Sequence, residues 1–443
     1  MSRLVLFVTG LAALASCAPS LLWSRHTDDR SLTLEVRRSG GGVWMDAVPR
    51  DGGGPGPPRL GPFDEIAIDH AVFVEDGRHF AIPARRGHDW FVLHDLAIEP
   101  AGQGVGALLF DGRGRHLAYA VEDAGRWRFV VDGRPGPAVS ALGEAMAFSE
   151  DGERTGYVAF DDGPAGCARV VTGARTGPCW RDVLELAVGC APEGDAYVAT
   201  DGAGKVIVRG GETVGRFEDV ADLRAARCGA RWAASVRQDG AWRVLVDGVA
   251  QPAATRIDAL SFAPGGLHVV YTAERDGWRV NVDGRDGERF DGVSPPAVSA
   301  DGSHVAYVGA RGGLRWLVVD GRATPAPPSA TGLALAPDGA RVAFVAGSAA
   351  HPTVVCDGVA YPFSLVIEGT LTFSRDGRHW AVLAGDLARR ALFVAVDGVP
   401  RAPIEARELF GGGLPASTAG AAIVLRRWVA AELERSLAER RPG

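Results

Sequence analysis

The chain has 443 residues, of which 47% are hydrophobic and 23% are charged, so it is long enough and apolar enough to bury a large core. The formal net charge is −7 and Lys and Arg form no basic face, which excludes a nucleic-acid surface because phosphate contacts require clustered positive charge. The 60 glycines and 27 prolines indicate many tight turns.

The first predicted element is an export signal in residues 1–16. Arg3 precedes an apolar run from Leu4 to Leu14, which is too short to be a transmembrane helix. The next residues, Leu14-Ala15-Ser16-Cys17, resemble the bacterial lipobox, and this resemblance implies cleavage before Cys17 and a diacylglycerol on its thiol. Two or more acyl chains hold a soluble body stably on a bilayer. A plain secretory signal with an incidental cysteine is the alternative.

The residue after the lipid site bears on the destination of the protein. Ala18 is not Asp, and by the sorting habit of lipoproteins the resemblance implies anchoring in the outer membrane, facing the periplasm or the cell surface. Residues 17–31 are predicted to be a tether. Residues 32–68 are predicted to form a partial repeat that lacks its first strand, because two short alternating stretches precede a Gly- and Pro-rich loop.

Residues 69–408 repeat a unit of about 37 residues, and fixed-period self-similarity of this size is typical of repeat architectures. Each unit contains an apolar strand, an Asp-Gly turn, a strand with Ala beside an aromatic residue, a further strand and a second Asp-Gly turn. The second turn recurs at Asp132, Asp247, Asp283, Asp320, Asp357 and Asp397. Asp-Gly supplies the positive φ angles that two-residue hairpins need.

A unit with four short strands and tight turns is close to the smallest blade of a β-propeller, in which radial repetition gives every unit the same neighbours. The predicted fold is therefore an all-β propeller of about nine four-stranded blades, within a range of 8–10, followed by a C-terminal helix. Closure at ten, with the two chain ends completing one blade by strand exchange, is the alternative.

Two aromatic sets and a histidine set recur at equivalent places in the units. We interpret the aromatic sets as packing between blades, and the histidines as residues bound to the local backbone at turns, because equivalent places on successive blades stand on the order of 10 Å apart, too far for one metal ion. The sets are Tyr119, Tyr157, Tyr197, Tyr271, Tyr307 and Phe344; Trp90, Trp127, Trp242, Trp278 and Trp316; and His79, His116, His268, His304 and His379.

The pattern Phe-Ser-x-Asp-Gly-x-x-x-Ala, complete at Phe373 to Ala381 and partly present at Phe148 to Gly152, resembles the repeats of TolB-type propellers, which are similar to WD-repeat proteins. Ala336-Pro337-Asp338-Gly339 shows a variant of it. The resemblance covers about residues 63–405 and implies the propeller fold in a bacterial envelope protein. This chain has more units than the six of the TolB propeller, and it carries Val-Asp-Gly or a variant at a second repeated site.

Five cysteines remain after Cys17, in a compartment that permits disulfides. Cys190 and Cys228 fall near the same point of successive repeats, and Cys167 and Cys179 could staple a hairpin; Cys356 makes the number odd. No pair has the spacing of a metal site, so we expect structural disulfides or buried thiols and no metal.

Residues 415–441 are predicted to form a helix with an apolar side that includes Val429 and Leu433. Docking of this helix on the propeller is the favoured interpretation, and a helix that binds a partner or a membrane surface is the alternative.

The sequence contains no His-Glu-x-x-His, Gly-x-Ser-x-Gly or phosphate-loop motif, so it identifies no catalytic residue and no cofactor. We expect a monomeric, lipid-anchored envelope propeller that acts as a protein- or glycan-binding or scaffolding module and is not an enzyme. The alternatives are a hydrolase or lyase with its site at the mouth of the axial channel, and a purely structural envelope protein.

Overall fold

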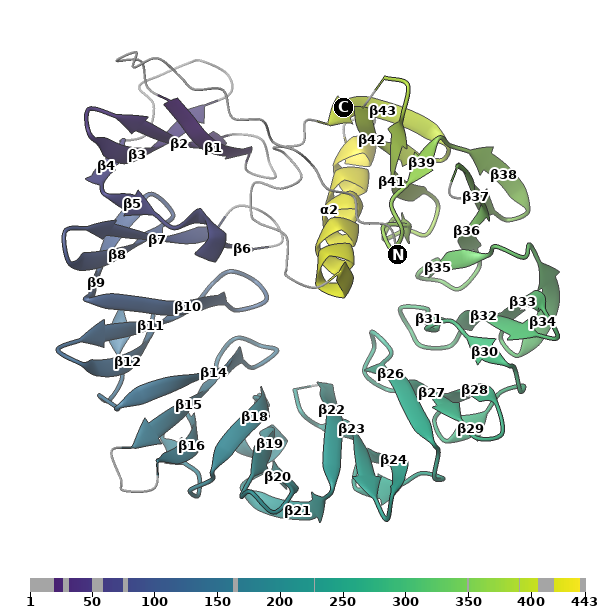
Figure 1. Cartoon of the computed structure of the whole chain (residues 1–443), viewed down its shortest axis with the longest axis horizontal. Coiled ribbons are helices and arrows are strands. Elements are labelled where there is room, and N and C mark those ends of the chain that lie inside the picture. The colour runs from purple at the N-terminus through teal and green to yellow at the C-terminus, as the bar shows by residue number, and fades with distance from the viewer. Residues whose placement is uncertain are drawn as a thin grey trace.

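The computed structural model describes residues 20–26, 32–49, 59–74, 79–161, 166–226, 228–348, 350–389, 391–404 and 418–438. These residues form strands β1 to β43, the short 3-10 helices η1 (Ile68–His70) and η2 (Pro192–Gly194), and the α-helix α2 (Thr418–Ala438). The sheets stand side by side as wedges around a common axis, and α2 lies on the inner side of the last blade (Figure 1). The predicted all-β propeller with a C-terminal helix is confirmed.

Six sheets contain four antiparallel strands in chain order. They are β1–β4 (Ser20–His26, Leu32–Ser39, Gly42–Pro49, Leu60–Phe63), β14–β17 (Ala141–Phe148, Thr155–Asp161, Cys167–Thr172, Arg175–Thr176), β18–β21 (Asp182–Ala187, Ala196–Thr200, Lys205–Arg209, Glu212–Phe217), β22–β25 (Asp219–Ala226, Arg231–Gln238, Ala241–Val246, Val249–Ala250), β26–β29 (Arg256–Phe262, Val269–Glu274, Trp278–Val282, Arg285–Asp286) and β35–β38 (Thr331–Leu335, Val342–Ser348, His351–Cys356, Val359–Pro362).

Two further sheets contain five strands, because the first strand of the unit is split into two short pieces that pair with the same neighbour. They are β30–β34 (Gly292–Val293, Ala297–Val298, Val305–Arg311, Leu314–Val319, Arg322–Ala326) and β39–β43 (Leu365–Val366, Thr372–Phe373, Trp380–Asp386, Ala391–Val396, Val399–Ile404).

The ninth sheet has nine strands and spans two repeat units. Its outer strand β9 ends at Gly102, only one residue before β10 begins, and Gly102 pairs in parallel with Glu122 of β11. No crossing segment therefore separates the two units. The strands are β5 (Glu65–Ile66), β6 (Val72–Phe73), β7 (Phe80–Arg86), β8 (Asp89–His94), β9 (Ala97–Gly102), β10 (Gly104–Phe110), β11 (Leu117–Asp123), β12 (Arg126–Val131) and β13 (Arg134–Pro135).

The expected count of about nine separate blades is wrong. The described residues form eight separate sheets of four or five strands, and the nine-stranded sheet joins two further units through the contact between β9 and β11. The N-terminal unit was expected to lack its first strand, but β1, from within the predicted tether, pairs antiparallel with β2 and completes a four-stranded sheet.

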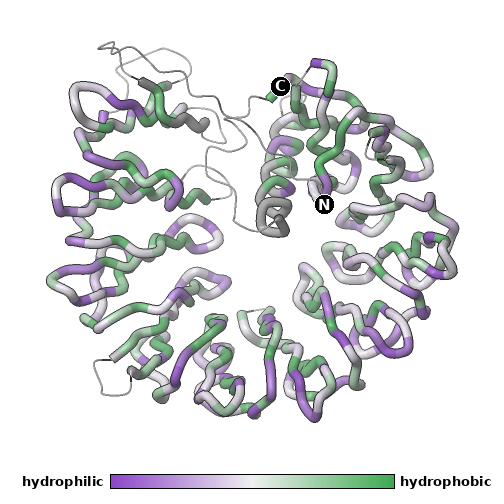
Figure 2. Tube along the Cα trace, in the orientation of Figure 1, coloured by the Kyte–Doolittle hydropathy of each residue, from purple (hydrophilic) through white to green (hydrophobic). Residues whose placement is uncertain are grey.

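The apolar cores lie between neighbouring blades. The face of sheet β18–β21, for instance, packs Val198 and Ile207 against Trp232 and Ala234 of sheet β22–β25. The repeated Tyr and Phe set occupies such interfaces, where each side chain is less than a tenth exposed, as interpreted from the sequence. Figure 2 shows hydrophobic residues along the strands and hydrophilic residues at many hairpins of the outer rim.

The second Asp-Gly of each unit forms the predicted hairpin turn. Asp247 and Gly248 have φ angles of 49° and 86°, and the other five repeated aspartates have φ angles of 49° or 50°. Both central residues of a type I′ turn need positive φ, which Asp and Gly tolerate better than other residues. The repeated Asp-Gly pairs therefore recur because the same turn, with its positive φ angles, recurs in successive units.

Each of these turns, and the equivalent turn at Asp95, is joined to the second strand of its unit by a clasp, in which the turn Asp accepts a hydrogen bond from a His or Arg at the start of that strand. In one blade Asp283 Oδ2 lies 2.6 Å from His268 Nδ1, while Asp283 Oδ1 accepts the Val269 N–H at 2.9 Å. The side chain also packs on the next blade, because a Cβ on Gly302 would lie 2.6 Å from the His268 ring. The repeated histidines thus stabilise the hairpin turns and the contacts between blades. The pairs are His79–Asp95, His116–Asp132, Arg231–Asp247, His268–Asp283, His304–Asp320, Arg341–Asp357 and His379–Asp397.

A helix covers one face of the last sheet. Helix α2 places Val429 and Leu433, both fully buried, on the face of the last sheet that has no following blade. Among the described residues, the first and last sheets share no strand, so the predicted alternative of strand exchange is not observed. No described helix has the length and apolarity needed to cross a bilayer.

Candidate functional site

Cys17, the predicted lipidation residue, lies outside the described residues, so its modification remains a prediction. The remaining cysteines form the two pairs suggested by the sequence. Cys167 is bonded to Cys179 and Cys190 to Cys228, with Cα atoms 5.4 and 4.7 Å apart. Cys356 is buried and free, and burial raises the pKa of its thiol to about 11.

Ser, Asp and His occur together in the inner turns of two blades, a combination that also occurs in hydrolases. In the turn before β32, however, Ser299 Oγ donates to Asp301 Oδ1 and accepts the backbone N–H of His304. The His304 ring instead contacts Asp320, at 2.7 Å. Ser374, Asp376 and His379 repeat this pattern. Because no imidazole reaches the hydroxyl, these sets stabilise turns and do not favour the hydrolase alternative.

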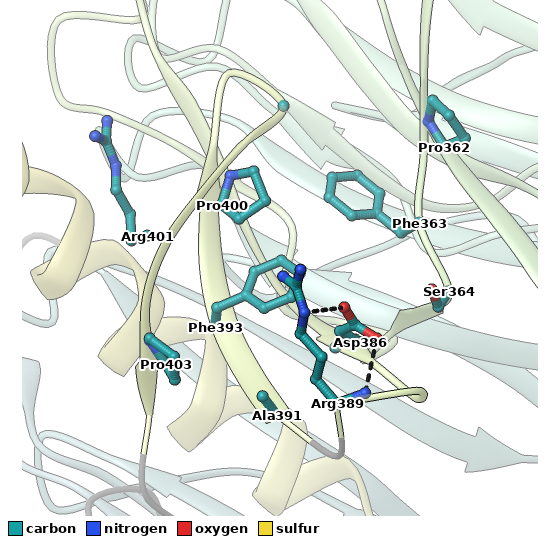
Figure 3. A pocket seen from close by; sticks show the side chains of 12 residues that line it. Pro362, Phe363, Ser364, Asp386, Arg389, Ala391, Phe393, Pro400, Arg401 and Pro403 are labelled. Carbon is teal, nitrogen blue, oxygen red and sulfur yellow. Dashed lines mark hydrogen bonds and ion pairs between the residues drawn. The ribbon is translucent and has the colours of Figure 1, made fainter.

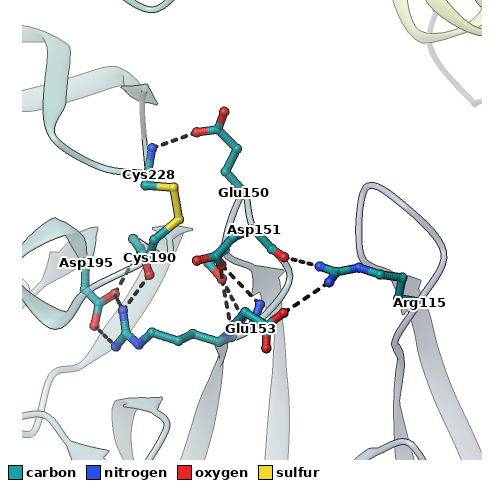
Figure 4. The surroundings of a disulfide bond; sticks show 10 residues. Arg115, Glu150, Asp151, Glu153, Cys190, Asp195 and Cys228 are labelled. Carbon is teal, nitrogen blue, oxygen red and sulfur yellow. Dashed lines mark hydrogen bonds and ion pairs between the residues drawn. A yellow bond between two sulfur atoms is a disulfide. The ribbon is translucent and has the colours of Figure 1, made fainter.

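The inner loops of three blades converge on the Cys190–Cys228 disulfide (Figure 4). They connect β14 to β15, β18 to β19, and β22 to β23. We call this place the three-loop junction and define it by Glu150, Asp151, Arg154, Cys190, Asp195 and Cys228. The backbones approach closely, since a Cβ on Gly194 would lie 2.6 Å from the Cys228 carbonyl oxygen. The Cys190 N–H also donates to that carbonyl, at 3.0 Å.

A buried ion pair between two of the three blades stabilises the junction. Arg154 binds Asp195 through two hydrogen bonds of 2.7 and 2.8 Å, and the side chains are only 17% and 9% exposed. Arg154 also donates to the Gly189 carbonyl, and Asp195 accepts the Gly189 N–H at 3.0 Å. The hydrogen bond to Asp195 raises the pKa of Arg154 above its usual value. Both charges are therefore neutralised by partners in the neighbouring blade.

The surface of the junction is acidic. Glu150 Oε2 accepts the Cys228 N–H at 2.6 Å, across two blades. Asp151 Oδ1 accepts from the Ser149 hydroxyl at 2.6 Å, and this bond is the main cause that holds the pKa of Asp151 below its ordinary value. Asp151 is therefore ionised at neutral pH. Its carboxylate lies close to both sulfur atoms, all ligand atoms being within 4.8 Å of one another.

A pocket of about 550 Å³ lies between the last two blades, on the side of strands β38 and β43 (Figure 3). The rings of Phe363 and Phe393 form part of its lining and also pack on the core between the two sheets. Its polar groups include Asp386 and Arg389, whose side chains approach to 3.6 Å. The other lining residues include Pro362, Ser364, Pro400, Arg401 and Pro403. The volume lies in the range of about 300 to 1,000 Å³ that is usual for ligand pockets.

Sequence reasoning identified neither the junction nor the pocket. A usable signal existed for the junction, because Glu150-Asp151-Gly152-Glu153 adds two acidic residues to the repeated Asp-Gly turn and both cysteines fall in inner turns. The pocket had no such signal. Phe363 and Phe393 lie in different blades, and only the packing of those blades brings them together.

No family model and no curated protein matches this sequence, so the resemblance to TolB-type repeats remains a prediction. Solved structures similar to this chain include a eukaryotic initiation factor, at 9% identity and a TM-score of 0.38, over 77% of this chain and 86% of that chain. Dihydro-heme d1 dehydrogenase NirN has 12% identity and a TM-score of 0.30, over 85% and 72% of the two chains. Dipeptidyl peptidase 4 from Porphyromonas gingivalis has 14% identity and a TM-score of 0.36, over 83% and 65%. The fold assignment rests on the sheets themselves.

Proposed function

We propose that this chain is an exported, lipid-anchored propeller that binds a protein partner in the cell envelope and acts as a binding or scaffolding module. Its export is supported by the apolar run before Cys17 and by two disulfides, which persist in oxidising compartments. The lipobox-like residues support a lipid anchor, in the outer membrane because Ala18 follows the cysteine.

The pocket between the last two blades is the observation that carries the binding role. Phe363 and Phe393 offer apolar surface, and prolines on both walls limit the flexibility of that surface. Aromatic and proline-lined grooves of this kind suit extended peptide segments, whose side chains fill the apolar part while polar groups at the edge bind the backbone. Asp386 and Arg389 supply one acceptor and one set of donors at the edge.

A protein segment fits this lining better than a glycan. Sugar hydroxyls require several polar partners, whereas much of this lining is apolar, with the rings of Phe363 and Phe393 and three prolines. The partner expected from this chemistry is an extended, predominantly apolar segment of another envelope protein. The side chain of Arg389 is 85% exposed and is therefore available to such a segment.

The test is capture of envelope proteins on the mature chain, followed by quantification of the partner with three variants. Phe363→Ser and Arg389→Glu alter the pocket, and Val249→Ser alters an exposed apolar residue on a distant outer hairpin. We expect Phe363→Ser to lower recovery at least about fivefold, the effect of losing a contact worth about 1 kcal/mol. Val249→Ser should leave recovery unchanged.

Thermal unfolding of each variant separates lost binding from lost folding. Equal recovery with folded Phe363→Ser and Arg389→Glu, or no recovered partner with the wild-type chain, would overturn the proposal.

A further inference from the structure

We infer that the three-loop junction is a redox-controlled metal site, in which Cys190, Cys228 and Asp151 bind a zinc-like divalent cation once the disulfide is reduced. In the oxidised state the two sulfur atoms cross-link two blades, as Figure 4 shows. In the reduced state the metal would replace that covalent link and add the blade of Asp151. The inference concerns the junction and is independent of the partner pocket.

The donor set fits zinc. Two thiolates and a carboxylate are ligands that Zn²⁺ accepts in tetrahedral sites, at about 2.3 Å for sulfur and about 2.0 to 2.2 Å for oxygen. Ligand atoms around such an ion lie roughly 3 to 4 Å from one another. The three donor atoms here are already within 4.8 Å of one another, so modest side-chain rotation completes the geometry. Within the described residues, this is the one group of three such donors.

Hydrogen bonds hold the donor residues in place, and the nearby cation Arg115 binds the Asp151 carbonyl and Glu153 rather than the Asp151 carboxylate. Asp151 keeps one carboxylate oxygen fixed by the Ser149 hydroxyl and the Glu153 N–H, which leaves the other oxygen for a ligand. The nearby guanidinium of Arg154 is already paired with Asp195. Water can supply the fourth ligand, as it does at zinc sites with three protein ligands.

The spacing along the chain explains why no sequence motif reveals the site. Asp151, Cys190 and Cys228 come from three successive blades, and they are placed by the repeat rather than by a local motif. The other disulfide provides an internal comparison. Cys167–Cys179 links residues of a single unit, and no such donor group is found there among the described residues.

The chemistry balances with a dithiol reductant of the thioredoxin-like class. The reductant gives two electrons and two protons to the Cys190–Cys228 bond and becomes a disulfide itself, leaving two thiols on this chain. One Zn²⁺ then binds both sulfurs as thiolates and releases two protons. An oxidised disulfide of the same class would take two electrons from the two thiolates and two protons from solvent to become a dithiol; the Cys190–Cys228 bond forms again and Zn²⁺ is released, because a disulfide sulfur is a poor ligand.

The test uses the mature chain, reduced with a phosphine under argon, and titrated with Co²⁺ as a spectroscopic substitute for Zn²⁺. We expect one equivalent to produce thiolate-to-cobalt charge-transfer absorption, which Zn²⁺ then displaces, and no such absorption with the oxidised chain. The Cys167→Ser/Cys179→Ser variant should retain the signal, and Cys190→Ser/Cys228→Ser should lose it.

Asp151→Asn should weaken cobalt binding at least about tenfold, since loss of outer-shell partners alone costs about 10- to 100-fold. Glu153→Gln is the matched control and should bind as the wild type does, because Glu153 pairs with Arg115. No charge-transfer band in the reduced wild-type chain overturns the inference. An unchanged titration with Cys190→Ser/Cys228→Ser does so as well. If that variant fails to fold, equal affinities of Asp151→Asn and Glu153→Gln would overturn it.

Discussion

Asp195→Asn breaks the buried ion pair that supports the three-loop junction. The substitution preserves side-chain volume but removes the charge opposite Arg154, whose guanidinium is only 17% exposed. It also places an amide NH₂ group against the N–H groups of Arg154. In the wild-type protein the carboxylate accepts hydrogen bonds from these groups at 2.7 and 2.8 Å. The variant therefore leaves a positive charge that is largely buried and poorly compensated.

The expected cost follows from that burial. Removing one partner of a buried pair typically costs about 3 to 5 kcal/mol, and partial exposure of Arg154 favours the lower end, about 3 kcal/mol. Arg154→Met should cost a similar amount because Asp195 then loses its main partner. The double variant has neither charge, so its destabilisation should be about 2 kcal/mol smaller than the sum of the two single-variant costs. The exposed pair Arg311–Glu288 is the control, and Glu288→Gln should cost about 0.5 kcal/mol or less.

Native-state hydrogen exchange is the suitable assay, because long repeat arrays can lose cooperativity in global unfolding. A loss of about 3 kcal/mol corresponds to an increase of about a hundredfold in the exchange rates of amides in β15 and β19. Protection in β32 and β33, far along the chain, should change less. Exchange in Asp195→Asn within about threefold of the wild type, or additive single-variant effects, would refute the reasoning about the buried pair.

Two further predictions concern the anchor and the clasps. Cys17→Ala should abolish labelling by radioactive palmitate and move the protein from the membrane to the soluble fraction, and membrane retention would contradict lipid anchoring. The Asp320 carboxylate raises the pKa of His304 above its ordinary value through their hydrogen bond, so the clasp stabilises the fold below about pH 6.5 and loses this contribution as pH rises through the raised pKa. His304→Gln should therefore lower the melting temperature more at pH 5.5 than at pH 8.5, and equal shifts at both values would contradict the role of the charged clasp.

The sequence alone determined the features that depend on local backbone chemistry. Asp247-Gly248 and its equivalents predicted hairpins because few residues other than Gly, Asn and Asp adopt positive φ easily, and the observed φ angles of 49° and 86° agree. Equal spacing of those turns predicted equal units, and hence a propeller. The alternation of apolar residues predicted that the repeated tyrosines lie between blades, and the side chain of Tyr271 is indeed only 1% exposed.

Only the tertiary structure decided what depends on contacts between units. A single residue separates β9 from β10, and the two units on either side of it belong to one sheet. Val429 of α2, rather than a further blade, covers the last blade. The three-loop junction and the pocket beside Phe363 assemble from different blades. A repeat specifies its own fold through short-range φ preferences and hydrophobic alternation, whereas the number of blades and the convergence of loops follow from the packing of all units around the axis.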